Sequence, residues 1–245
     1  ADLVSSLGRL GHRVRRIGSE EIRPGRLMAG LCLAASLGRM DDARRRFAAL
    51  RLRNLTAAID AACAAERFDL IHCHDPLAGC AAGRGVHSAR VPRVQTIHGP
   101  LVFESQMGTD MEAGRSGHLA ALEAIERDSF HSAGRLIAVD TGQAGIARTK
   151  YGVDPAGIDI IFNAVLCDEV ERLALHPPAA TVAPPYVLAP RRLVAKNGVD
   201  VAVRAMALLT DIPRLKLVSV GGGPERAALD ALVGELGIRD RVVFL

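Results

Sequence analysis

The residues best suited to chemistry lie in a basic loop between a short apolar run, residues 186–190, and a helical pattern that begins at Val199. The loop holds several side chains or backbone groups that could contact an anion: Arg191, Arg192, Lys196, Asn197 and Gly198. A strand that ends in a basic loop at a helix start favours anion binding, because unpaired N–H groups, the helix dipole and guanidinium donors act together. The loop therefore predicts a phosphate site, with a merely solvated basic surface as the alternative.

A glycine loop follows the next expected strand, residues 215–220. Gly221, Gly222 and Gly223 come directly after this strand, and Pro224 suits the first turn of the helix that follows. Backbone N–H groups in such a loop can come close to an anionic or sugar ligand. The motif is not GxGxxG, and glycines also serve tight turns, so a binding role and a turn role both stay open.

Histidines cluster where the first two expected strands end. His72 and His74 lie at the end of the strand expected over residues 68–73, and His98 follows the strand expected over residues 91–97. In parallel sheets functional residues collect at the carboxyl ends of strands. His72 and His74 share a face and could bind a metal, but no carboxylate or cysteine cluster completes the ligand set. His98 is the stronger candidate, because the glycine after it lets a ligand approach the backbone.

The elements that must position these groups alternate along the chain, which predicts an α/β protein. Further helices are expected over residues 2–9, 41–66, 77–88, 115–132 and 140–152, and further strands from His12, over 135–139, over 158–162 and over 242–245. Residues 18–40 are irregular, and residues 101–114 read as a loop. The proline-rich stretch HPPAATVAPP, residues 176–185, is expected to be a domain linker.

Composition restricts the class of protein. The 245 residues are 49% hydrophobic and 3% aromatic, which suits one large or two modest α/β domains. The net charge of +4 comes almost entirely from arginine, and no basic cluster alternates with aromatics, so we expect no nucleic acid partner. Five cysteines without a CxxC pair indicate neither a disulfide framework nor a zinc site, and they favour a reducing, cytoplasmic location.

Membrane contact is expected only at a surface, if at all. The most apolar run, residues 27–37, is shorter than the roughly 20 residues that span a bilayer, and no secretory pattern is present. The helix expected over residues 41–66 carries several arginines away from its apolar stripe. Such a face is usually solvated, and the alternative is peripheral contact with the anionic inner face of a membrane.

Taken in order, these segments resemble the GT-B-fold retaining glycosyltransferases of family 4. The segments that carry the resemblance are FDLIHCHDPLAG, VPRVQTIHGP, RLIAVDTGQAGIARTKYGV, IDIIFNA, RRLVAKNGVDVAVRA and LVSVGGGPERAALDALVGELGIRDRVVFL. The resemblance implies an acceptor-side Rossmann-like domain over residues 1–175 and an incomplete donor-nucleotide domain over residues 186–245. It also implies a nucleotide diphosphate sugar as donor, a hydroxyl acceptor on a glycan, lipid or small molecule, and neither a cofactor nor a catalytic metal.

The resemblance implies roles for individual residues. His98 would lie beside the transferred sugar, and His74 would face the acceptor. Arg192 and Lys196 would neutralise the donor diphosphate, because breaking the sugar–phosphate bond builds negative charge on this leaving group. The residues expected to contact the donor are Asn163, Asn197, Gly222 and Gly223.

The sequence also departs from the family pattern. Lys196 stands one residue early, with Asn197 in the expected lysine position, and Ala164 replaces a typical glycine. The family's first strand and its paired glutamates are missing, so we expect a fragment that is truncated at both ends and is poorly soluble or inactive by itself. Two alternatives stay open: a degenerate GT-B scaffold that binds nucleotide sugar without transfer, and a nicotinamide-dependent oxidoreductase suggested only by the glycine loop. The sequence identifies neither the sugar, the base nor the acceptor.

Overall fold

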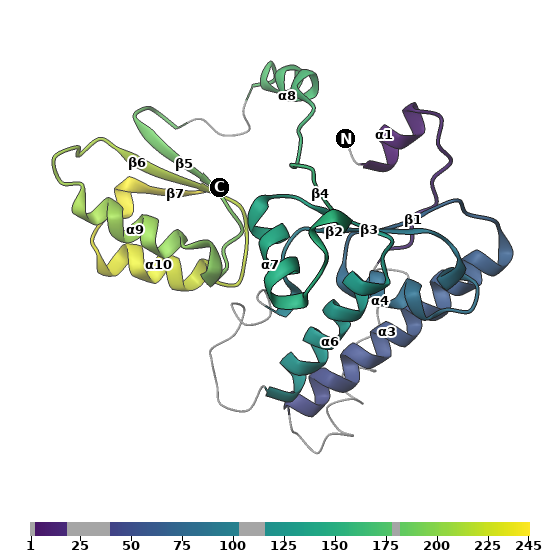
Figure 1. Cartoon of the computed structure of the whole chain (residues 1–245). Coiled ribbons are helices and arrows are strands. Elements are labelled where there is room, and N and C mark those ends of the chain that lie inside the picture. Colours follow the sequence, from purple (N-terminus) through teal and green to yellow (C-terminus); the bar gives the residue numbers. More distant parts are fainter. Residues whose placement is uncertain (1–2, 19–39, 103–115, 178–181) are drawn as a thin grey trace. The chain divides into compact units, whose positions relative to one another are not determined.

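The computed structural model describes residues 3–18, 40–102, 116–177 and 182–245, which belong to two compact units (Figure 1). The first unit runs to Leu166, and the second begins at Cys167. Each unit contains one parallel β-sheet with helices packed against it. The linker expected at residues 176–185 lies in the second unit, ahead of its first strand.

The sheet of the first unit has the order β1-β2-β3-β4, with every pair parallel. Its strands are β1 (Ile71–Cys73), β2 (Arg93–Ile97), β3 (Arg135–Ala138) and β4 (Ile158–Ile160). The connecting helices are α4 (Pro76–Arg84), α6 (Ser116–Ser132) and α7 (Thr141–Tyr151), with short 3-10 helices η2 (Ser88–Arg90) and η3 (Pro155–Gly157). Each connection steps to the next strand in the same direction, which places the helices on one face of the sheet, as Figure 1 shows.

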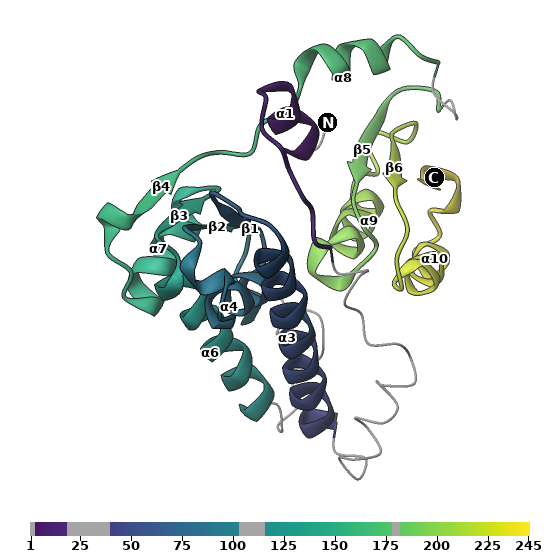
Figure 2. The same cartoon turned by 90° about the vertical axis from the view of Figure 1, so that its right-hand side faces the viewer.

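The long helix α3 (Met40–Ala65) adds a further layer to this unit. It lies along α4 and α6 (Figure 2), as its expected apolar stripe requires. Leu52, Leu55 and Ile59 are buried and join the same core cluster as residues of α4 and Ile125 of α6. The helix expected over residues 41–66 is therefore confirmed, because burial of one apolar stripe stabilises an otherwise polar helix.

The chain before α3 differs from its expected course. Helix α1 (Leu3–Arg9) is followed by Gly11 at φ 86°, as a helix stop requires, but residues 12–18 form no strand. Arg13 and Arg15 instead pair with Glu66 at the end of α3, at 3.4 and 2.5 Å. The strand expected from His12 was wrong. The irregular stretch expected at residues 18–40 and the loop expected over 101–114 lie almost wholly outside the described residues.

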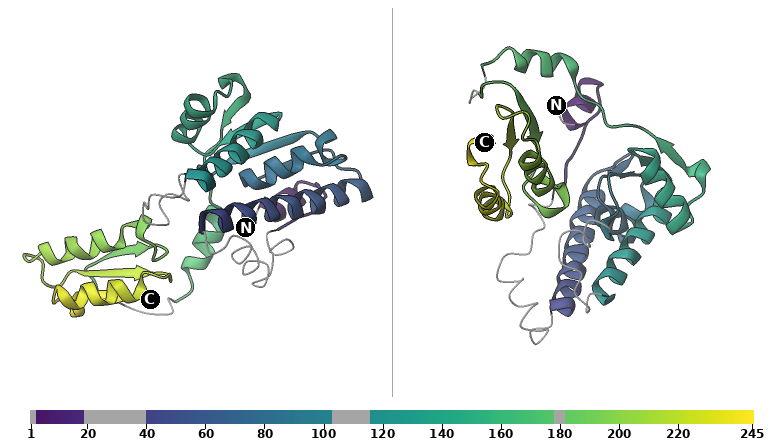
Figure 3. Two further views of the ribbon diagram at one scale, coloured as in Figure 1. Left: turned by 90° about the horizontal axis from the view of Figure 1, so that it is seen from below. Right: turned by 90° about the vertical axis from the view of Figure 1, so that its left-hand side faces the viewer.

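The second unit is a three-stranded parallel sheet of order β5-β6-β7. Its elements are α8 (Cys167–Ala174), β5 (Tyr186–Pro190), η4 (Ala195–Asn197), α9 (Val199–Leu208), β6 (Lys216–Val220), α10 (Arg226–Glu235), η5 (Arg239–Arg241) and β7 (Val242–Phe244). Helices α9 and α10 lie side by side on the same face of the sheet (Figure 3), where Val203, Leu217 and Leu229 share one core. Helix α8 has no counterpart among the expected elements, and α10 starts after Pro224 rather than with it.

A buried carboxylate ties the turn after β2 to two helices. Glu126 of α6 is fully buried, and its Oε1 accepts a hydrogen bond from the backbone N–H of Leu101 at 2.7 Å. Its Oε2 accepts one from the Tyr151 hydroxyl at the end of α7, at 2.5 Å. Burial, together with this hydrogen bond, raises the pKa of Tyr151, so the phenol remains a donor. The hydrogen bond from Leu101 to Glu126 therefore fixes the backbone just after His98.

Replacing Tyr151 with Phe should destabilise the first unit by about 1–3 kcal/mol, because the buried Glu126 carboxylate loses one of its two donors. Urea unfolding followed by circular dichroism measures this change. Tyr186→Phe, at an exposed tyrosine in the second unit, is the matched control and should leave the unfolding midpoint unchanged. Equal midpoints for Tyr151→Phe and the control would contradict this role of Glu126.

The backbones of the two loops that follow β5 and β6 are in close contact. Gly221 has φ 136°, and a Cβ there would lie 2.5 Å from the carbonyl oxygen of Arg191. A Cβ at Gly223 would collide with the backbone of Leu193, whose N–H donates to the Gly222 carbonyl at 3.0 Å. By contrast, a Cβ at Gly222 would meet nothing within 4 Å. Glycine is thus required sterically on both sides of Gly222, while Gly222 itself borders open space.

Gly223→Ala should separate the two loops and cost about 1–3 kcal/mol of stability, because the new methyl group strikes backbone that cannot move independently. Gly222→Ala is a control at the adjacent residue and should be tolerated. Thermal unfolding of both variants gives the comparison. If Gly222→Ala proved the more damaging of the two, the described packing of these loops would be incorrect.

Candidate functional site

The candidate site residues form two groups, one in each unit, and both lie where parallel strands end. In the first unit His74 follows β1 and His98 follows β2. In the second unit the basic loop follows β5 and the glycine loop follows β6. This is the edge at which open parallel sheets bind ligands, because the loops and the helix N-termini gather there.

Three histidines of the first unit, His72, His74 and His98, form a contiguous cluster. Nδ1 of His74 lies 3.0 Å from Nε2 of His98, within hydrogen-bond distance, and the two rings stack with centroids 5.3 Å apart. The ring of His72 lies 4.2 Å from that of His74, and its Nε2 is hydrogen-bonded to the Thr96 hydroxyl at 2.8 Å. His72 and His74 thus share a face, as their spacing predicted, and His98 joins them from the neighbouring strand.

Partial loss of solvent contact lowers the pKa of two of these histidines, although His74 and His98 both reach the surface. This loss lowers the pKa of His74 to about 4, and the neighbouring His72 and His98 act in the same direction. Burial also lowers the pKa of His72, with His98 as the second cause. His72 and His74 are therefore neutral at pH 7. Within the described ranges, no group of three or more histidine, cysteine or acidic side chains could hold a metal ion.

The backbone around both histidines is fixed by carboxylates. Asp75, directly after His74, caps α4, and its Oδ1 accepts from the N–H groups of Leu77 and Ala78 at 2.7 and 3.3 Å. Glu126 fixes the chain after His98 in a similar way. Glu126 was not predicted from the sequence, although an acid beside Ile125 in the apolar stripe of a helix is a signal for a buried carboxylate.

The basic loop of the second unit presents exposed cations. Arg191, Arg192 and Lys196 are all exposed, and the two guanidinium groups have no partner within the described part of the chain. The Asn197 side-chain amide donates to the carbonyl oxygen of Arg192 at 2.8 Å and so closes the loop. Gly198, at φ 64°, then starts α9. Asn197 in place of the family's lysine therefore has a structural role, and its expected contact with the donor stays a prediction.

The remaining predicted donor residues differ in their surroundings. Gly222 borders open space, whereas Gly223 packs on Leu193, and donor contacts of either stay predictions. Asn163 lies in the first unit, in an exposed segment after β4. Close to the glycine loop, the Arg226 guanidinium stacks over the ring of Phe244, 4.5 Å from its centroid, a contact that the sequence pattern did not reveal.

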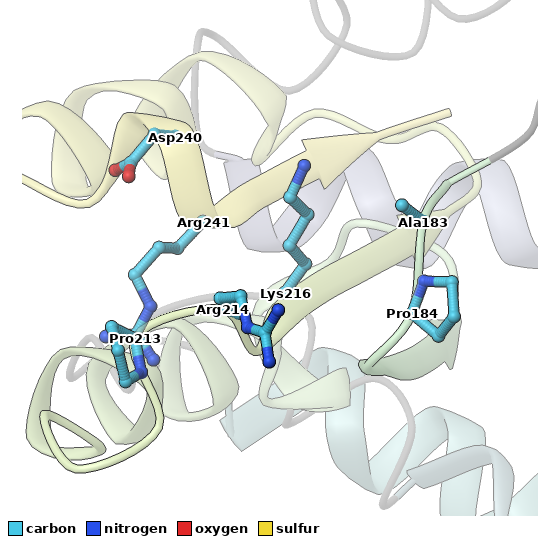
Figure 4. A pocket seen from close by; sticks show the side chains of 7 residues that line it. All are labelled: Ala183, Pro184, Pro213, Arg214, Lys216, Asp240 and Arg241. Atoms are coloured by element: carbon cyan, nitrogen blue, oxygen red, sulfur yellow. The ribbon is translucent and has the colours of Figure 1, made fainter.

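A small cavity of the second unit lies at the amino-terminal ends of its strands, opposite the strand ends that carry the basic and glycine loops (Figure 4). It measures about 200 Å³ and is lined by Ala183, Pro184, Pro213, Arg214, Lys216, Asp240 and Arg241. Lys216 is the first residue of β6, whereas the basic and glycine loops follow the strand ends. The Arg241 guanidinium is occupied by backbone carbonyls, including that of Leu209 at 2.9 Å. This cavity is therefore separate from the candidate site.

Curated relatives of the chain are glycosyltransferases. A 2-deoxystreptamine glucosyltransferase from Streptomyces kanamyceticus is 31% identical over 177 residues, which are 69% of this chain and 44% of the relative. An uncharacterized glycosyltransferase of Methanocaldococcus jannaschii is 26% identical over 74% of this chain and 47% of its own length. A D-inositol 3-phosphate glycosyltransferase from Mycolicibacterium gilvum is 28% identical over 73% and 41%. The chain thus spans less than half the length of these relatives.

Two solved structures illustrate the similarity of fold. Anabaena HepE in complex with UDP and glucose matches with a TM-score of 0.57 and 19% identity, over 79% of this chain and 50% of that one. Sucrose-phosphate synthase from Thermosynechococcus elongatus matches with a TM-score of 0.58 and 23% identity, over 80% and 49%. These likenesses confirm the expected α/β, GT-B fold class.

Family models match both parts of the chain. The model of Glycosyltransferase Family 4 covers residues 1–169, and that of Glycosyl transferases group 1 covers residues 177–245. The first match alone takes in more than half of the chain, and the two together follow the same order as the two units. The family expected from the sequence is therefore confirmed, and the chain belongs to Glycosyltransferase Family 4, with a second part of the Glycosyl transferases group 1 type.

Proposed function

We propose that the protein is a retaining glycosyltransferase that moves a sugar from a nucleotide diphosphate sugar to an acceptor hydroxyl. The observation that carries this proposal is the loop after β5, where Arg192 and Lys196 are exposed beside the backbone around Gly222. The Asn197 hydrogen bond holds the backbone of Arg192 in place before any ligand binds. A cation carried on a fixed backbone at a strand end, next to a helix start, suits a diphosphate.

In the proposed reaction, the bond between the anomeric carbon and the donor phosphate oxygen breaks. The acceptor oxygen forms the new bond on the same face of the sugar, its proton passes to the phosphate oxygen that the sugar leaves, and the nucleoside diphosphate departs. Arg192 and Lys196 stabilise the negative charge that builds on this leaving group. His98 lies beside the transferred sugar and orients it, and His74 lies on the acceptor side. Fixed side-chain cations thus carry the charge stabilisation in this proposal, without a cofactor or metal.

The comparisons suggest which substrates to test first. HepE was solved with UDP and glucose, so UDP-glucose is the first donor to try. Two relatives are named for D-inositol 3-phosphate and 2-deoxystreptamine, both of which are cyclic polyhydroxy compounds. We therefore propose a hexose donor. The acceptors to test are cyclic polyols, glycans and glycolipids, and the last two correspond to a role in polysaccharide or glycolipid biosynthesis.

Cellular location is also a proposal. None of the helices in the described ranges combines the length and apolarity needed to cross a membrane. Arg46 and Arg53 of α3 are exposed, so peripheral contact with an anionic membrane surface is kept as a proposal beside a cytoplasmic location.

The alternative of a GT-B scaffold without transferase activity depended partly on Asn197. The hydrogen bond by which Asn197 closes the basic loop is compatible with an active site.

Arg192→Ala and Lys196→Ala should each lower turnover of UDP-glucose by about 10²–10³-fold in the full-length protein, because each removes a cation from the leaving group. Arg214→Ala is the matched control, since Arg214 is an exposed arginine of the same unit at the opposite sheet edge. It should keep full activity. Full activity in both loop variants would show that the diphosphate binds elsewhere.

We also propose that residues 1–245 alone are poorly soluble or do not transfer sugar. Apolar side chains at the open side and edge of the second sheet are exposed, including Tyr186, Leu188 and Val220 at 40–54%. The core of the second unit lies between the sheet and helices α9 and α10, and no helix among its described residues covers the opposite face of the sheet. Expression of this segment and an assay of donor affinity give the test, and a monodisperse, fully active product would contradict the proposal.

A further inference from the structure

We propose that His74 is a positioning residue for His98, holding its imidazole in one orientation and one tautomer through a ring-to-ring N–H···N hydrogen bond. This inference rests on the proposed function, in which His98 lies beside the transferred sugar. It concerns a contact inside the first unit, so the arrangement of the two units does not enter it. The acceptor-side role expected for His74 is a separate proposal.

The geometry of the pair restricts its protonation. Nδ1 of His74 and Nε2 of His98 are 3.0 Å apart, so one nitrogen must carry the hydrogen and the other must offer its lone pair. Two hydrogens between these atoms would clash, so only one of the two facing nitrogens carries a hydrogen. Because Nε2 of His98 is engaged by His74, Nδ1 is the ring nitrogen of His98 that stays available to a ligand.

His74 is itself well fixed, as a positioning residue must be. On one side its ring packs against His72, 4.2 Å away, and His72 is held by Thr96 at 2.8 Å. On the backbone side, Asp75 anchors the turn by accepting two N–H hydrogen bonds of α4. The His74 ring therefore has support from β1, from β2 through Thr96, and from the helix start.

The surroundings of His74 disfavour a positive charge on its ring. The titratable groups that face His74 are His72 on β1 and His98 after β2, while the Asp75 carboxylate is turned to the N–H groups of α4. Burial first, and the two histidines second, lower the pKa of His74 to about 4. His74 is therefore neutral at pH 7, and one hydrogen lies between its Nδ1 and the Nε2 of His98.

Three variants of the full-length protein test this inference. His74→Phe keeps a flat ring against His72 but removes the hydrogen bond. His74→Asn keeps a hydrogen-bonding amide near the former Nδ1 position. His87→Phe, at an exposed histidine outside the cluster, is the matched control. Each variant is assayed for kcat, donor KM and the pH profile of kcat, and the His98 ring nitrogens are followed by ¹⁵N NMR.

We expect His74→Phe to lower kcat by about 10- to 100-fold, with donor KM within about twofold, because a misplaced ring affects the reaction more than binding. The acid limb of the pH profile should shift, and the ¹⁵N signal of His98 Nε2 should lose its hydrogen-bonded character. His74→Asn should recover most of kcat, and His87→Phe should match the wild type.

Wild-type kcat, pH profile and His98 ¹⁵N signals in His74→Phe would overturn the inference. So would a chelator-sensitive His98 signal in the wild type, which would make the two nitrogens metal ligands instead of hydrogen-bond partners. A further variant, His98→Ala, distinguishes the proposed role of His98 in the reaction from the proposed positioning role of His74. Full activity in His98→Ala would refute the proposed function of His98 itself, whereas loss of activity in His98→Ala with none in His74→Phe would refute only the positioning role.

Discussion

Parallel pairing of the described strands is the constraint on which the rest of this structure depends. In each unit every strand points the same way, so every connection must return across the sheet through a helix. The carboxyl ends of β1 and β2 then meet at one edge, which brings His74 and His98 within hydrogen-bond distance. The same constraint brings the loops after β5 and β6 together, and Gly223 permits their close contact.

Most of the fold follows from local patterns and could be predicted from the sequence. The apolar stripe through Leu52, Leu55 and Ile59 indicated α3, since a helix repeats every 3.6 residues. Asp140 and Gly152 marked the ends of α7 correctly, because capping depends on residues within one turn of each end. The strand expected from His12 was wrong because a helix stop followed by a few residues does not show whether a partner strand is available.

The contacts that define the candidate site could not be predicted in this way. Glu126 meets Leu101 and Tyr151 across 25 residues of sequence, and His74 meets His98 across 24. Each contact depends on which elements become neighbours, which no local pattern specifies. The residue types were still informative: both histidines were predicted as site residues, and the basic loop was identified from its composition. The hydrogen bond that makes Asn197 part of that loop required the structure.

The central claim is that the loop after β5 binds the diphosphate of a nucleotide sugar. The most direct measurement is a crystal structure of the full-length protein with UDP. Our account predicts phosphate oxygens within hydrogen-bond distance of the Arg192 guanidinium and the Lys196 ammonium, at the edge where β5 and β6 end. A diphosphate bound at the other edge of this sheet, in the cavity lined by Arg214 and Lys216, would contradict it.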